Sequence, residues 1–143
     1  MKLLENLEYR KLMTKQLKEQ LLFLLKNSEE FMIVVNMDGV EFNPTLPPEI
    51  EDALNKDFIP FAIGGYTFKS AFVENEKFIF EAGFGSENIG AMVYIDISRI
   101  LQIVIAENPI FINVTATAPK ETPKNSMEVF ASKSRNQRFF KKS

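Results

Sequence analysis

The chain has no histidine, no cysteine and no tryptophan among its 143 residues. The absence of histidine removes the commonest general base of enzymes, and the absence of cysteine removes the strongest side-chain nucleophile. Without either residue type the usual ligands of zinc are missing, and no disulfide can form. We therefore expect neither a metal site nor a cofactor. Any catalysis would have to rest on carboxylates, lysine, tyrosine or serine.

The short motifs of phosphate-binding and hydrolytic enzymes are also missing. No Walker loop, nucleophile elbow or dinucleotide fingerprint occurs, and no Gly-Lys-Ser/Thr follows the glycine-rich stretch GFGSENIG at residues 83–90. The neighbouring carboxylates Glu74 and Glu76 alternate with Asn75 and Lys77, which is typical of an exposed turn. We predict that the protein is not an enzyme.

Long apolar runs are absent as well. No run approaches the roughly eighteen residues that a membrane-spanning helix needs. The first residues, MKLLENLEYRK, are charged throughout and lack the apolar core of a signal peptide. We expect a soluble, cytoplasmic protein with one domain, because a chain of this length can bury one sizeable core.

The charges divide the chain into two parts. Residues 1–118 carry 10 Lys+Arg and 17 Asp+Glu, a balance of −7, whereas residues 119–143 carry 7 and 2, a balance of +5. The acidic body argues against broad contact with nucleic acid, which requires a basic surface. We expect a folded body over 1–118 and a separate basic tail over 119–143.

Residues 1–26 are rich in leucine, lysine and glutamate and lack glycine and proline, which predicts a helix. An apolar stripe recurs at spacings of four, four and three residues. Two interpretations are open: the stripe packs on the sheet of its own chain, or it forms the seam of a homodimer. The stripe consists of Met13, Leu17, Leu21 and Leu24.

From residue 31 to 118 the pattern is that of short strands separated by turn residues. Phe78, Phe80, Ala82 and Phe84 alternate and share one strand face. We predict a further strand over YTFKSAFV at residues 66–73, and a turn at Ser98–Arg99 before the next strand. Five to seven short strands after one helix predict a mainly β, α+β fold built as a small curved barrel or half-barrel.

The stretch FEAGFGSENIG at residues 80–90 holds three of the six glycines. Glycine within a strand marks a bend or a place where another backbone approaches closely. Both interpretations are open: curvature of the barrel, or a bound ligand lying on a floor without side chains.

The tail is polar and basic without periodicity, which predicts disorder. Its end, RNQRFFKKS, places two phenylalanines among cations. This is typical of a short docking peptide, and a solubilising tail is the alternative. The residues concerned are Arg138, Phe139, Phe140, Lys141 and Lys142.

Residues 58–108 resemble the core of the stringent starvation protein B (SspB) family. The most specific stretch is FIFEAGFGS at residues 78–86, with its Phe-x-Ala-x-Phe-Gly pattern. The stretch VYIDISRILQIVIAEN at residues 93–108 is similar as well. The order of the parts also agrees: an N-terminal helix, a β-rich body and a tail ending in a basic and apolar peptide.

The resemblance implies a function. SspB proteins are bacterial adaptors of the ClpXP protease; their Sm-like barrel dimerises through the N-terminal helix and binds an extended peptide, the ssrA tag. Their tails dock on the N-terminal domain of ClpX. Familiar members carry a positive side chain where this chain has Gly83. On this basis we expect peptide contacts from Phe61, Phe80, Ala82, Gly83, Phe84, Gly85 and Ser86.

Two other functions are compatible with the sequence. An Sm-like barrel can bind RNA, and the phenylalanines of the tail could stack on single-stranded bases. The second of these alternatives is a dimeric scaffold that binds no peptide.

Overall fold

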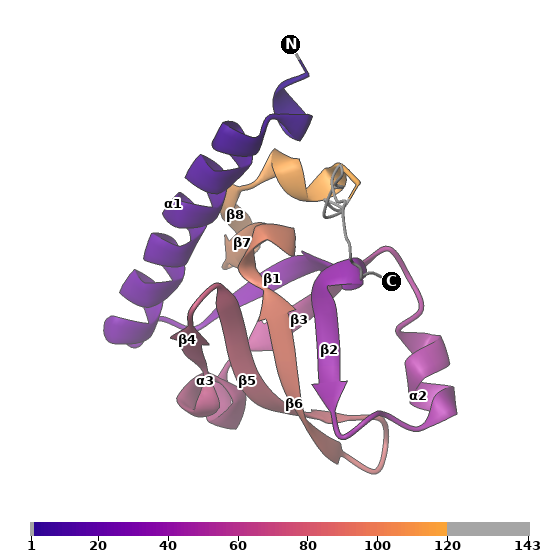
Figure 1. The fold of residues 1–143 in the computed structure, drawn as a ribbon. Coiled ribbons are helices and arrows are strands. Elements are labelled where there is room, and N and C mark those ends of the chain that lie inside the picture. The colour runs from indigo at the N-terminus through magenta and orange to yellow at the C-terminus, as the bar shows by residue number, and fades with distance from the viewer. Residues whose placement is uncertain (1, 120–143) are drawn as a thin grey trace.

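The computed structural model describes residues 2–119 (Figure 1). A short 3-10 turn, η1 (Leu3–Glu5), leads into the helix α1 (Leu7–Lys26). The side chain of Asn6 caps this helix by accepting a hydrogen bond of 2.9 Å from the backbone N–H of Tyr9. The helix predicted for 1–26 is thus confirmed over Leu7–Lys26, and the cap explains why it begins there.

Within the described residues 2–119, eight strands form two antiparallel, four-stranded sheets. The first has the order β3-β1-β7-β8 and consists of β1 (Phe31–Asn36), β3 (Phe58–Ile63), β7 (Ile100–Ile105) and β8 (Asn108–Ile112). The second has the order β2-β6-β5-β4 and consists of β2 (Val40–Asn43), β4 (Phe72–Glu74), β5 (Lys77–Phe84) and β6 (Ile89–Asp96). The helix α2 (Pro48–Ala53) lies in the connection between β2 and β3.

The fold is mainly β with an N-terminal helix, as the sequence predicted, but the prediction of a barrel is wrong. The two sheets are not closed into a barrel. Two 3-10 turns, η2 (Met37–Gly39) and η3 (Ile97–Arg99), carry the chain from one sheet to the other. Within residues 2–119 no strand pairs across the two sheets, because these turns interrupt the strands that would otherwise bridge them. A last 3-10 turn, η4 (Val114–Thr117), ends the body.

The core lies between the two sheets and is closed by α1. Strand β1 buries alternate residues, and so does the C-terminal part of β6, as expected for strands with one face against a core. The largest fully buried side chains are Phe78 and Phe80 of β5. Apolar burial of this kind contributes most of the favourable free energy of folding.

The apolar stripe of α1 belongs to this core. Leu17 and Leu21 are 0% exposed, and Met13 and Leu24 are buried as well. The stripe has no surface left for a second copy of the chain. The interpretation of these four residues as a dimer seam is therefore corrected: they attach the helix to its own body.

The segment predicted as a strand over 66–73 forms instead a helix, α3 (Gly65–Ser70), followed by the three-residue strand β4. The backbone N–H of Gly65 donates to the carboxylate of Glu30 at 3.0 Å, and Gly65 adopts a φ of +56° that favours glycine. Phe68 packs edge-to-face on Phe31, with ring centroids 6.4 Å apart. These contacts hold the chain in a helical turn and shorten β4.

Candidate peptide-binding site

The shortness of β4 leaves part of β5 without a neighbouring strand. Strand β5 pairs with β6 from Lys77 to Phe84, whereas β4 pairs only with residues 77–79. The backbone N–H of Glu81 donates to Ser70 Oγ at 2.9 Å, so this peptide group faces away from β6. Alternate residues of a strand point their backbone groups to the same side. The N–H and C=O of Gly83 therefore face the same open edge.

A hollow of about 260 Å³ lies beside this edge. Half of its lining residues have little or no side chain, so the backbone itself forms much of the surface. A Cβ atom at Gly83 would overlap the side chain of Asn88, which accounts for glycine at this position. The lining residues are Gly64, Tyr66, Thr67, Glu81, Ala82, Gly83, Asn88 and Gly90.

The hollow is acidic. The hydroxyl of Tyr66 donates to Glu81 Oε1 at 2.8 Å. This hydrogen bond and the negative charge of Glu81 raise the pKa of Tyr66 above its ordinary value, so the phenol stays protonated at neutral pH. The lining residues include one carboxylate, Glu81, and no lysine or arginine. The carboxylate of Glu30 lies next to Gly64 at the rim.

The predicted peptide-binding residues divide into four groups. Ala82 and Gly83 line the hollow. Phe61 and Phe80 are 7% and 0% exposed and pack edge-to-face on each other, with ring centroids 5.7 Å apart. Their assignment as walls of a groove is corrected, because both rings lie in the core. Phe84 is half-buried against Phe42, with ring centroids 5.4 Å apart.

The remaining two predicted residues lie in the turn between β5 and β6. Gly85 has a φ of +76°, which favours glycine, and Ser86 is exposed. Of the three glycines in the stretch 80–90, Gly85 therefore makes a turn, while Gly83 and Gly90 line the hollow.

Sequence reasoning missed the residues that α3 contributes. Tyr66 and Thr67 come to the hollow only because residues 65–70 are helical. The pair Gly64-Gly65 is the signal that could have indicated it, since such a pair interrupts a strand pattern. Asn88 was missed for a similar reason, because its role depends on the geometry of the turn before β6.

The comparisons with known proteins give no relative. No protein-family model matches the chain, and no curated protein or solved structure matches it. The resemblance to the SspB family stays a prediction that rests on the quoted stretches. The predicted docking residues, Arg138 to Lys142, lie outside the described residues.

Within residues 2–119, no helix combines the length and the hydropathy needed to cross a membrane. The same part of the chain holds no group of three acidic side chains arranged to bind a metal ion.

Proposed function

We propose that this protein is an adaptor that binds an extended, ssrA-like peptide tag on other proteins and delivers them to the ClpXP protease in the cytoplasm. The observation that carries the proposal is the edge of β5 at Gly83, past the hydrogen bond of Glu81 to Ser70, beside a hollow lined by small residues. An extended peptide can pair its backbone with such an edge, and the hollow can take one of its side chains.

The charge of the hollow indicates which peptides it takes. Glu81 lies in the lining, Glu30 stands at the rim, and the lining contains no cation. A neutral or basic peptide residue is favoured at this place, because an acidic one would meet like charge. The cargo tag should therefore carry a neutral or basic residue where it passes Gly83.

Delivery depends on the tail. Its end, with Phe139 and Phe140 between cations, would dock on the N-terminal domain of ClpX. The phenylalanines would supply the apolar contact, and Arg138, Lys141 and Lys142 would steer the approach to an acidic site.

The homodimer expected from the family would bring two such tails, and two linked contacts raise avidity by ~10²–10⁴ over one contact. Two chains that associate through α1 must use its outward face, because the inward stripe is buried. Leu12, Leu22 and Phe23 are the large apolar residues exposed there.

The direct test measures turnover of a fluorescent protein bearing an ssrA tag by ClpXP, with and without the full-length chain. Acceleration at low substrate concentration, together with saturable binding of the tag peptide by the chain alone, would support the proposal. Binding without acceleration would favour a peptide-binding scaffold. Binding of single-stranded RNA that weakens steeply with salt, without tag binding, would favour the RNA-binding alternative.

A further inference from the structure

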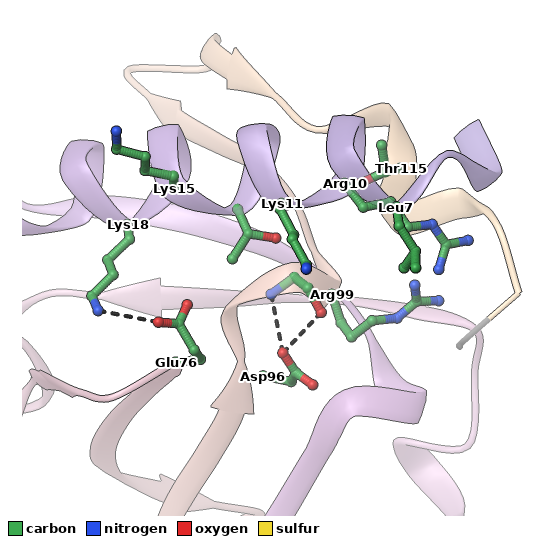
Figure 2. A pocket seen from close by; sticks show the side chains of 11 residues that line it. Leu7, Arg10, Lys11, Lys15, Lys18, Glu76, Asp96, Arg99 and Thr115 are labelled. Atoms are coloured by element: carbon green, nitrogen blue, oxygen red, sulfur yellow. Dashed lines mark hydrogen bonds and ion pairs between the residues drawn. The ribbon is translucent and has the colours of Figure 1, made fainter. Parts of the chain in front are cut away.

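A second hollow, of about 600 Å³, lies between α1 and the turn η3 (Figure 2). Glu76 lines it just before β5 begins, whereas Glu81 and Gly83 line the first hollow further along the same strand. A strand advances about 3.3 Å per residue, so the two hollows are separated by roughly 20 Å along β5. The second hollow is therefore a distinct surface.

The second hollow is basic, although the body is acidic. Five of the 10 Lys+Arg of residues 1–118 line it, against two carboxylates. Both carboxylates already have partners: Glu76 pairs with Lys18 at 3.3 Å, and Asp96 accepts from the N–H and hydroxyl of Ser98. The five cations are Arg10, Lys11, Lys15, Lys18 and Arg99.

The two arginines are held in fixed positions. Arg99 is 3% exposed, makes a two-point ion pair with Asp38 at 2.9 and 3.1 Å, and donates to the carbonyl of Ala118 at 2.9 Å. Arg10 donates to the carbonyls of Leu4 and Pro119 at 2.8 and 2.9 Å. Within residues 2–119, neither Nη1 group has a hydrogen-bond partner. The guanidinium group of Arg10 thus keeps a donor for a ligand, whereas Arg99, whose side chain is 4% exposed, contributes its charge from the wall of the hollow.

The lysines differ in their availability. Lys11 extends into the hollow in Figure 2, and no residue of the described part of the chain pairs with it. Lys15 also belongs to the lining, but its ammonium group points away. Lys18 pairs with an exposed carboxylate, and such surface ion pairs are weak enough to exchange for another anion.

We propose that this hollow binds a small polyanion, a ligand of small-molecule size with at least two phosphate or carboxylate groups. Its volume falls within the range of small-molecule sites. Lys11 and Lys18 are separated by roughly 10 Å along the helix axis, so their ammonium groups can contact two anionic groups of one ligand. Guanidinium and ammonium donors, with the hydroxyl of Thr14, suit such groups. This proposal does not depend on the adaptor function.

The test is a calorimetric titration of the full-length chain with inorganic triphosphate and, in a second arm, with citrate. We expect binding of either probe to weaken at least tenfold in Lys11→Glu. Tighter binding of triphosphate would identify a phosphate ligand, and tighter binding of citrate a carboxylate ligand. The basic tail is identical in all variants, so the part that depends on Lys11 reports on the hollow.

Two controls make the same charge change elsewhere. Lys15→Glu lies on the same helix with its side chain directed away, and it should weaken binding less than Lys11→Glu. Lys69 is exposed on α3, near the other hollow, so Lys69→Glu should change the affinity for either probe only slightly. Equal affinity of wild type and Lys11→Glu, or no binding of either probe at millimolar concentration, would overturn the proposal. Lys11→Ala should lie between wild type and Lys11→Glu.

Discussion

The hollow beside α3 and the hollow beside α1 differ in volume, charge and the kind of residue that lines them. The hollow beside α3 is small, acidic and floored by glycine and alanine, whereas the hollow beside α1 is larger, basic and lined by long side chains. Strand β6 contributes to both, Gly90 to the first and Asp96 to the second, whereas β5 contributes only to the first. The net charge of the body, here −7, therefore does not predict the charge of each binding surface. Local clustering of charge decides which ligand each surface favours.

The largest effect should come from removing the end of the tail. Deletion of residues 135–143 should reduce ClpXP turnover of tagged cargo to the level seen without the adaptor, because the docking peptide is lost. Affinities for tag peptide and for triphosphate should change by less than twofold, since both hollows lie in the body. Turnover assays run beside two binding titrations measure this. Equal turnover by both forms would show that delivery does not use the tail.

Ala82→Gln should weaken binding at the hollow beside α3 without changing binding at the hollow beside α1. A long polar side chain at this half-buried position would obstruct the peptide path, and tag binding should weaken tenfold or more, about 1.4 kcal/mol. Triphosphate binding should be unaffected, and Lys11→Glu should show the reverse pattern. Fluorescence anisotropy and calorimetry on both variants give the four affinities.

Ala82→Ser, which adds one atom, serves as the control for Ala82→Gln and should keep tag binding within threefold. Loss of the folded circular-dichroism spectrum in Ala82→Gln would instead assign this residue to the core. A parallel loss of both ligands in a folded variant would show that the two hollows are coupled.

Glu81→Gln tests whether the negative charge in the hollow beside α3 favours peptides with a basic residue. Removing one partly exposed charge changes affinity by ~0.2–1 kcal/mol, so a peptide with a basic residue should bind roughly 1.4- to fivefold more weakly. A peptide neutral at that position should bind unchanged, because glutamine keeps an acceptor for the hydroxyl of Tyr66. Glu41→Gln removes the same charge from β2, away from the hollow, and should leave both peptides unaffected. Equal losses for basic and neutral peptides would contradict a charge-based preference.

The smallest effect concerns Tyr66→Phe, which should change tag affinity by less than twofold because the hydroxyl is exposed. The raised pKa means that the hydrogen bond to Glu81 persists below the ordinary tyrosine pKa of about 10 and is lost as pH rises through the raised value. The difference between wild type and Tyr66→Phe should stay constant from about pH 7 to pH 9. A difference that disappears near pH 8 would contradict the raised pKa.

The sequence predicted the parts of the fold that depend on local pattern. The helix over Leu7–Lys26 followed from its composition, and the turn at Ser98–Arg99 with a strand after it followed from the predominance of isoleucine and valine. Helix α3 was missed because Tyr66 and Phe68 alternate with polar residues, as they would in a strand. A closed barrel was wrongly predicted because closure depends on pairing between strands that are distant in the chain.

The residues of the candidate site were likewise predicted only where the local sequence pattern reveals them. Ala82 and Gly83 are recognisable because small residues are unusual within a strand of phenylalanines. Phe61 and Phe80 cannot be told from Phe84 by pattern, since all three alternate in strands, and only packing sends two of them to the core. The hydrogen bond between Tyr66 and Glu81 depends on the position of α3, which the local pattern did not reveal.

The hydrogen bonds from Arg99 and Arg10 to the consecutive carbonyls of Ala118 and Pro119 have a mechanical consequence. They fix the chain to the turn η3 and to α1 at the point where the body ends. A pulling force applied beyond Pro119 reaches these two guanidinium groups before it reaches β8. The load is shared between a helix attached by its buried stripe and a turn anchored by the Arg99–Asp38 ion pair. The edge strand is thereby shielded from being peeled off the sheet.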